Sequence, residues 1–207
     1  CVCLICSNLL EVKMISLGGI TATAGLIVFP ISYIINDCIA EVWGYRKARL
    51  IIWLGFLTNL MAIIFIQIAI ILPWDGQKSF ETVFSSTPRI LLASFIAFLV
   101  GSFLNAYVMS KMKISSKGKH FSLRAITSTV VGESADSLLF FPIAFGGVVP
   151  VNELLILIVT QACLKTAYEI VILPVTIRVV RFVKKIDGSD VYDQKVSYNI
   201  FKIKELQ

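Results

Sequence analysis

Six ionisable side chains lie inside or at the edges of apolar stretches of this 207-residue chain. They are Asp37, Glu41, Glu133, Asp136, Lys165 and Glu169. They form three pairs with spacings of four, three and four residues, and each spacing places both members on one face of a helix. A charged group at the centre of a membrane helix costs about 2.5–3.5 kcal/mol on insertion scales, so such groups mark functional sites. Carboxylates in this setting can accept hydrogen bonds from an N–H-rich or cationic ligand, or exchange protons.

The balance of charge favours a ligand site over internal salt bridges. Five carboxylates face one lysine, Lys165, so ion pairs among the six would leave four negative charges without a partner. Gln161 extends Lys165 and Glu169 into one polar stripe, because the three residues follow one another at intervals of four. Asp37 and Glu41 lie near the end of their apolar stretch, where basic residues and water are within reach. For this pair a structural role and a ligand-binding role both stay open.

Aromatic, cysteine and basic residues narrow the choice of ligand. Tyr33 and Phe140 could supply flat surfaces on which a planar ligand stacks. All five cysteines lie in apolar segments without the spacing of metal ligands, so we expect neither a metal site nor a cofactor. The net charge of +6 comes from basic residues spread over short loops and a tail. That pattern indicates membrane orientation rather than nucleic-acid binding.

The composition of the chain indicates whether water or lipid surrounds these residues. Hydrophobic residues make up 57% of the chain and charged residues 15%, whereas roughly a quarter of a soluble domain is charged. Lipid must therefore cover much of the surface, and the sequence predicts an all-α, polytopic membrane protein. A span needs about 20 apolar residues. We expect six spans, the first incomplete, at residues 1–10, 22–42, 49–72, 89–110, 125–149 and 151–180.

Basic residues in the connections alternate along the chain. They are frequent at 46–49, at 111–124 and after 178, and sparse in the loops between. The positive-inside rule then places both termini in the cytoplasm. The short break from Gly146 to Pro150 predicts a tight hairpin between the last two spans.

The basic loop in the middle divides the predicted membrane domain, 1–187, into halves of about 1–112 and 120–187. Three spans in each half would give the halves opposite orientations, which is the inverted repeat of many secondary transporters. The second and fifth spans then correspond, and both carry paired acids and are interrupted by Pro or Gly. Such interrupted spans in matching positions indicate the binding site. Residues 188–207 are expected to form a polar cytoplasmic tail.

Three blocks of residues carry a resemblance to a known family. The first holds Phe29–Tyr33, Asp37 and Glu41–Tyr45; the second holds Arg124, Ser128, Thr129, Gly132, Glu133, Asp136, Ser137 and Phe140; the third holds Gln161, Lys165, Tyr168, Glu169 and Pro174. Over about residues 20–187 the chain resembles the queuosine precursor transporter family, also called the vitamin uptake transporter family.

The resemblance implies a multi-pass importer of the bacterial inner membrane whose substrate is a 7-deazaguanine: the 7-cyano or 7-aminomethyl base, or queuine. Such a base presents a ring N–H and an exocyclic amine side by side, which one carboxylate can accept together. We expect Glu133 or Glu169 to bind this edge, with Asp136 orienting it. Lys165 can donate to the ring carbonyl, and Phe140 or Tyr33 can stack on the bicycle.

The sequence contains no nucleotide-binding loop motif, so secondary transport is expected, driven by protons or by sodium. One alternative is the substrate-binding subunit of an energy-coupling-factor importer, which would need partner ATPases. A second is an intramembrane aspartyl hydrolase, but the residue contexts of such proteases are missing. The preferred deazaguanine, the coupling ion and assembly into a homodimer stay open.

Overall fold

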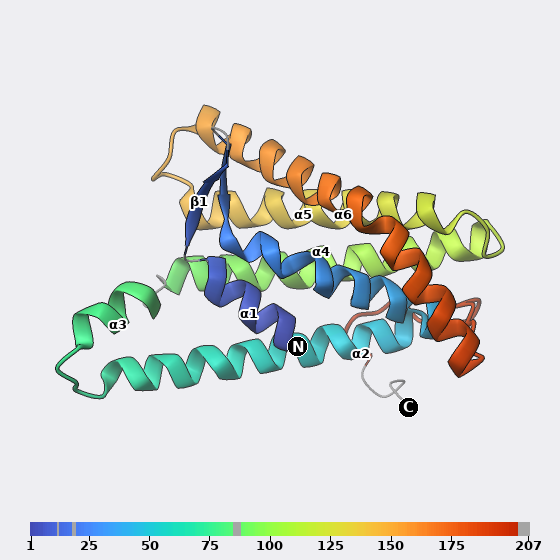
Figure 1. Cartoon of the computed structure of the whole chain (residues 1–207), viewed down its shortest axis with the longest axis horizontal. Coiled ribbons are helices and arrows are strands. Elements are labelled where there is room, and N and C mark those ends of the chain that lie inside the picture. Colours follow the sequence, from blue (N-terminus) through green and yellow to red (C-terminus); the bar gives the residue numbers. More distant parts are fainter. Residues whose placement is uncertain (12, 18–19, 85–87, 203–207) are drawn as a thin grey trace.

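The computed structural model describes residues 1–11, 13–17, 20–84 and 88–202, and most of them are helical (Figure 1). The helices are α1 (Val2–Glu11), α2 (Phe29–Ile71), α3 (Gln77–Phe84), α4 (Pro88–Ser115), α5 (Phe121–Phe145) and α6 (Val151–Asp187), with a short 3-10 helix, η1 (Ala24–Ile27). The predicted helical class is confirmed apart from an antiparallel hairpin of β1 (Met14–Leu17) and β2 (Ile20–Thr23). This hairpin was not predicted from the sequence.

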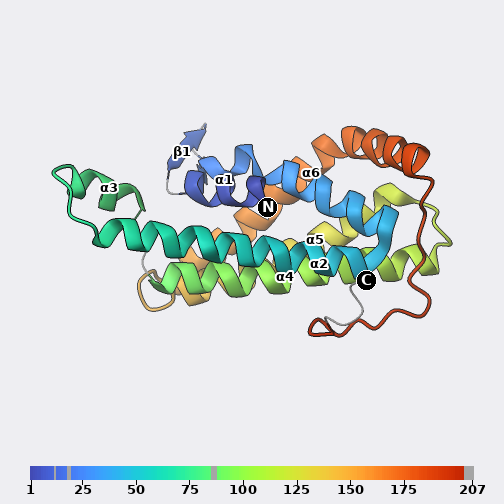
Figure 2. The same ribbon diagram turned by 90° about the horizontal axis from the view of Figure 1, so that it is seen from below.

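Helix α2 reverses its direction at Gly44, where φ is +79° and ψ is 179°. Its two arms, 29–43 and 45–71, run back along each other from this turn (Figures 1 and 2). Only glycine adopts such a backbone without strain. A Cβ atom at residue 44 would also lie 2.6 Å from Asp193 Oδ1. The arms lie within or close to the residues predicted as the second and third spans, 22–42 and 49–72, although the first arm begins at residue 29 rather than 22.

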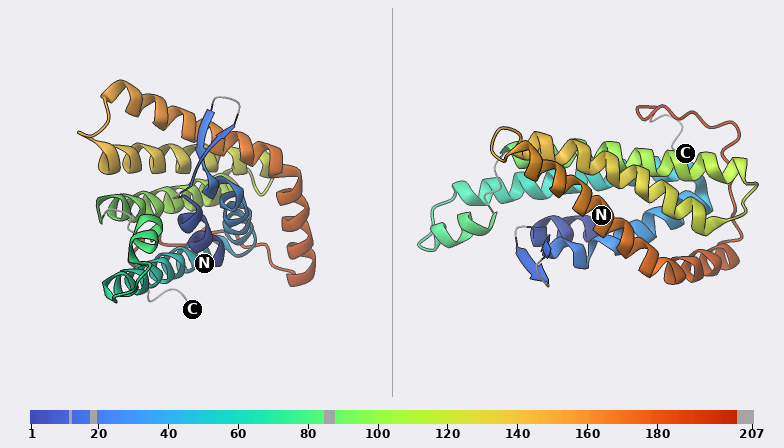
Figure 3. Two further views of the ribbon diagram at one scale, coloured as in Figure 1. Left: turned by 60° about the vertical axis from the view of Figure 1, so that its left-hand side comes forward. Right: turned by 90° about the horizontal axis from the view of Figure 1, so that it is seen from above.

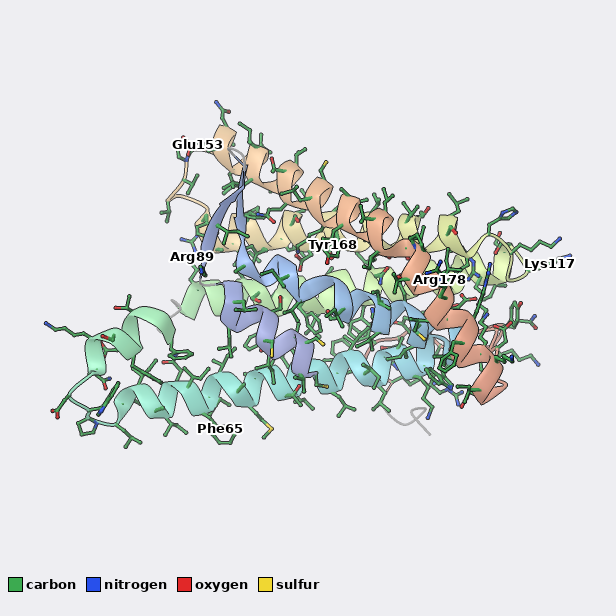
Figure 4. All side chains as sticks on the ribbon, viewed as in Figure 1. Phe65, Arg89, Lys117, Glu153, Tyr168 and Arg178 are labelled. Atoms are coloured by element: carbon green, nitrogen blue, oxygen red, sulfur yellow. The ribbon has the colours of Figure 1, made fainter. Side chains whose placement is uncertain are left out.

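The larger helices form layers: α6, α5, α4 and the second arm of α2 follow one another across the molecule (Figure 3, left). Small and apolar side chains of α2, α4, α5 and α6 fill the space between them; this core includes Ala40, Tyr45, Ala48, Ile52, Phe103, Ala106, Met109, Ala125 and Leu173. The outward faces are also apolar. Phe65, for example, is 63% exposed and points away from the bundle (Figure 4).

Among the described residues, three helical segments are long and apolar enough to cross a membrane: Ile34–Ile71, Leu92–Ser115 and Val151–Asp187. The first includes the turn at Gly44. Together with the apolar outer faces, these segments identify a membrane protein. The number of six spans and the inverted repeat stay predictions.

The segment after α6 packs across the Gly44 turn. The Asp193 carboxylate accepts the Tyr45 N–H at 2.8 Å and the Ser110 hydroxyl at 2.5 Å. Arg49 donates to the carbonyl of Asn199 at 2.7 Å, and Trp53 donates to that of Ile200 at 3.0 Å. Residues 188–202 of the predicted polar tail are therefore held against α2 and α4. Asp193 satisfies an N–H group that the turn leaves without a helical partner.

Helices α4 and α5 approach each other closely at two glycines, Gly101 and Gly132. A Cβ atom on Gly132 would lie 2.9 Å from the Gly101 carbonyl oxygen and 2.9 Å from the Asn105 Cβ atom. A Cβ atom on Gly101 would lie 2.9 Å from the Gly132 carbonyl oxygen. Small residues of this kind let membrane helices pack backbone to backbone. The contact matters for function because Gly132 immediately precedes Glu133.

Replacing Gly132 with Ala should lower stability by about 1–3 kcal/mol, because the two backbones must separate. The thermal midpoint of the purified protein in detergent measures this effect. Gly55→Ala is the matched control, since its Cβ atom would lie 3.6 Å from the nearest side chains, an ordinary contact. Equal midpoints for the two variants would contradict the close packing of α4 on α5.

Candidate functional site

A buried polar network lies between α2, α4, α5 and α6. Its members are Asp37 on α2, Asn105 on α4, Thr129, Glu133 and Asp136 on α5, and Lys165 and Glu169 on α6. Tyr168, labelled in Figure 4, marks the level of this network on α6. The helical spacing that paired the acids in the sequence explains the arrangement: one turn of α5 and one turn of α6 each carry two of the charged groups.

Lys165 joins the two acids of α5. Its Nζ atom lies 2.9 Å from Glu133 Oε2 and 3.1 Å from Asp136 Oδ2. Glu133 is fully buried, whereas the side chains of Lys165 and Asp136 are 14% and 21% exposed. Within the described part of the chain, Glu133 Oε1 has no hydrogen-bond partner. A buried carboxylate oxygen without a donor is costly, so this atom is suited to accept a hydrogen bond from a ligand.

The second part of the network joins α2 to α6. The carboxyl groups of Asp37 and Glu169 lie next to each other, and the hydroxyl of Thr129 lies near Glu169. Among the described residues, Asp37 Oδ2 and Glu169 Oε1 are buried oxygens without a hydrogen-bond partner. Asn105 Nδ2 donates to Asp37 Oδ1 at 3.2 Å. Asp37 and Glu169 are 0% and 3% exposed. The pair is thus shut away from water, and its neighbours Asn105 on α4 and Thr129 on α5 are neutral.

Glu41 belongs to a different cluster, at the end of the bundle where α2 turns. Arg124 holds both of its oxygens, with Nη1 2.5 Å from Oε2 and Nη2 3.0 Å from Oε1. Lys184 Nζ lies 2.8 Å from Oε1, and Lys113 Nζ lies 3.9 Å from it. Asp190 joins the cluster through Lys113 and Lys184. The geometry favours a structural role for Glu41.

This cluster corrects the charge balance inferred from the sequence. Lys113 and Arg124 were assigned to a loop, but they lie in the last turn of α4 and the first turn of α5 and are 2% and 1% exposed. Because they compensate Glu41, the sequence count of four unmatched negative charges is too high. Four carboxylates, Asp37, Glu133, Asp136 and Glu169, remain beside Lys165, an excess of three. The signal for Arg124 was present in the sequence, as part of the second block.

Three other predicted site residues lie less centrally. Gln161 is half-buried on α6, one turn before Lys165. Phe140 lies on α5, one turn after Asp136, with its ring centroid 5.2 Å from that of Phe141. The side chain of Tyr33 lies outside the described part of the structure. None of the described His, Cys, Asp and Glu side chains forms a group of three or more that could hold a metal ion.

Comparison with known proteins shows the family to which this chain is similar. Residues 23–179 match the family model described as "Putative vitamin uptake transporter". A "Probable queuosine precursor transporter" from Bacillus subtilis (strain 168) is 32% identical over 176 residues, which cover 82% of this chain and 76% of that protein. No solved structure gives a significant match.

Two further relatives agree. The "Queuosine precursor transporter" of Escherichia coli (strain K12) is 29% identical over 67% of this chain and 62% of that protein. A "Probable queuosine precursor transporter" from Haemophilus influenzae is 26% identical over 66% of this chain and 59% of that protein. The family match spans all the charged residues of the network. The chain therefore belongs to the vitamin uptake transporter family, a family of membrane transporters and not of enzymes.

Proposed function

We propose that this chain imports a 7-deazaguanine precursor of queuosine across the bacterial inner membrane as a secondary transporter. Three relatives are named as queuosine precursor transporters or probable ones, which supports the substrate class. The observation that carries the proposal is the buried Glu133, bridged to Lys165 on one oxygen and without a hydrogen-bond partner among the described residues on the other. A ligand that brings adjacent N–H donors would satisfy this carboxylate.

The chemistry of a 7-deazaguanine suits the groups around Glu133. Its ring N–H and exocyclic amine can donate side by side to a carboxylate, a charge-assisted arrangement that also fixes the orientation of the base. Lys165, which is within reach of the same carboxylate, can donate to the ring carbonyl next to that edge. Phe140, one turn beyond Asp136, can stack on the bicycle.

Between the two candidates for the amidine-like edge, the geometry favours Glu133 over Glu169. The buried Oε1 atom of Glu169 also has no hydrogen-bond partner among the described residues, but its neighbour is a second carboxyl group, Asp37. Glu133 instead lies beside Lys165, which can donate to the ring carbonyl of the same base. Asp136 is the more exposed of the two acids that Lys165 joins. Asp136 then orients Lys165 rather than the base directly.

The transport step in this proposal is alternating access around a midplane site. The proposal includes six spans with both termini in the cytoplasm. The parts that move against each other are the two halves, about 1–112 and 120–187. Asp37 on α2 and Glu169 on α6 belong to different halves, so the network lies where the halves meet. The turn at Gly44 joins two arms of α2 and is a point at which they can change their angle.

The purified full-length chain, reconstituted alone in liposomes, tests the proposal. We expect liposomes loaded with unlabelled 7-cyano-7-deazaguanine to exchange it for the labelled base added outside. Guanosine, whose sugar-bearing nitrogen and bulk differ, serves as a competitor that should leave the exchange intact. Exchange only after addition of partner ATPases and ATP would instead identify a subunit of an energy-coupling-factor importer.

A further inference from the structure

We infer that Asp37 and Glu169 together bind the proton whose movement drives uptake. The inference rests on the proposed transport function and adds to it a coupling ion and a place for that ion. The network then has two parts with different roles. Glu133 and Lys165 bind the base, and the carboxyl groups of Asp37 and Glu169 bind the proton.

The contact between the two carboxyl groups is the first observation. Asp37 comes from α2 and Glu169 from α6, the two side chains are neighbours, and both residues are nearly inaccessible to water. Each has one buried oxygen, Asp37 Oδ2 and Glu169 Oε1, without a hydrogen-bond partner among the described residues. Two ionised carboxylates in contact repel each other strongly where the dielectric constant is low, so such pairs share one proton. A shared proton gives a hydrogen bond that links α2 to α6.

The amide of Asn105 supplies a second, independent observation. It donates from Nδ2 to Asp37, yet its buried Oδ1 atom has no hydrogen-bond partner in the described part of the chain. Asn105 is 1% exposed. An acceptor buried beside the pair, with no donor assigned to it, is suited to a carboxyl group that carries a hydrogen.

The charged groups near the Asp37–Glu169 pair form ion pairs of their own. On α2 the next acid is Glu41, whose charge Arg124 and Lys184 compensate. On α5 the facing groups are neutral Thr129 and, one turn on, Glu133; on α6 the neighbour is Lys165, which bridges Glu133 and Asp136. On α4 the facing group is Asn105, which is neutral. A proton on the carboxyl pair would balance one of its two negative charges.

The position of the pair explains how the proton and the base are coupled. Glu169 lies one helical turn from Lys165 on α6, and Thr129 lies one turn from Glu133 on α5. Binding of the base to Glu133 and Lys165 thus acts on the same two turns that hold the pair. A protonated pair holds α2 against α6, and loss of the proton to the cytoplasm leaves two negative charges that push these helices apart. The proton enters with the base and forms an O–H bond on one carboxyl group of the pair, and that bond breaks when the proton leaves to the cytoplasm.

The test uses the full chain in liposomes, with a pH-sensitive dye and 7-cyano-7-deazaguanine as the probe. With an acidic outside, we expect wild-type protein to accumulate the base and to carry protons inward when the base is added. Asp37→Asn and Glu169→Gln should each lose at least tenfold in accumulation and lose the proton signal, while still exchanging labelled for unlabelled base. Glu153→Gln, an exposed acid at the start of α6 (Figure 4), should accumulate like wild type.

Each alternative outcome is distinct. Accumulation at the wild-type level by both amide variants, or accumulation driven by a sodium gradient and not by pH, would overturn the inference and leave the proposed function standing. Loss of exchange in both variants, with monodisperse protein, would place the pair in the substrate site and also overturn it. Failure of wild-type protein to exchange the base would instead overturn the proposed function. Glu169→Asp, which keeps a carboxyl group, should retain a proton signal with an altered pH profile.

Discussion

Replacing Glu133 with Gln should lower uptake of 7-cyano-7-deazaguanine by roughly 100-fold at limiting substrate concentration. A hydrogen bond to a charged group contributes about 1.5–3 kcal/mol, and the carboxylate accepts two of them from the base. The carboxamide keeps one acceptor oxygen but turns an NH2 group toward a second donor. A loss of about 3 kcal/mol corresponds to about a 100-fold change in affinity. Uptake in cells that cannot make queuosine measures the effect.

Two variants control this experiment. Lys165→Met should also reduce uptake, because it removes the donor for the ring carbonyl and leaves Glu133 without the partner that lies 2.9 Å away. Glu153→Gln changes an exposed acid on the same helix as Lys165 and should leave uptake near the wild-type value. Wild-type uptake by Glu133→Gln, at a normal amount of protein in the membrane, would remove Glu133 from the binding site.

Replacing Glu41 with Leu should prevent most of the protein from folding stably. The substitution leaves Arg124 and Lys113, which are 1% and 2% exposed, without the carboxylate that they surround. Breaking a buried ion pair from one side costs about 3–5 kcal/mol, a large part of the roughly 5–15 kcal/mol that stabilises a typical protein. The yield of monodisperse protein in detergent and its thermal midpoint measure the loss.

Asp190 is the matched control, because it binds two of the same cations but its side chain is 45% exposed. Although partial burial opposes its ionisation, hydrogen bonds from Lys113 and Lys184 hold the pKa of Asp190 below its usual range. Its contribution is therefore present at neutral pH and is lost as the pH falls through this lowered pKa. Asp190→Asn should cost much less than Glu41→Leu.

A second substitution shows whether an unpaired cation causes the defect. Adding Arg124→Met to Glu41→Leu should restore part of the yield, since replacing both members of a buried pair with apolar groups is often tolerated. A stable Glu41→Leu protein, or a double variant that is worse than the single one by the full cost of each change, would contradict the structural role of Glu41.

Local spacing in the sequence predicted the parts of the site that lie on single helices. The intervals within Glu133 and Asp136, and within Lys165 and Glu169, follow from the helical repeat alone, and the structure brings the first pair to Lys165. The break between the last two predicted spans was also predicted: α5 ends at Phe145 and α6 begins at Val151. Both features depend on residues close in the sequence.

Long-range contacts could not be predicted in this way. Lys113 and Arg124 have the sequence context of a basic loop, and nothing within ten residues of either indicates that Glu41 is the partner. Likewise, the polar residues 188–202 were predicted to form a tail. In the structure the Asp193 carboxylate accepts a hydrogen bond from the backbone N–H of Tyr45, 148 residues earlier. The Asp37–Glu169 contact has the same origin, since it depends on how α2 packs against α6. Such pairings are properties of the folded bundle.

The discrimination of purified protein between 7-deazaguanine and 7-deazahypoxanthine tests the central claim most directly. The second base lacks the exocyclic amine and so cannot offer Glu133 two adjacent donors. For wild-type protein we expect 7-deazaguanine to bind at least tenfold more tightly, and for Glu133→Gln we expect this preference to fall to about threefold or less, from the loss of a hydrogen bond to a charged group. An equal preference in the two proteins would contradict the assignment of Glu133 to the amidine-like edge of the base.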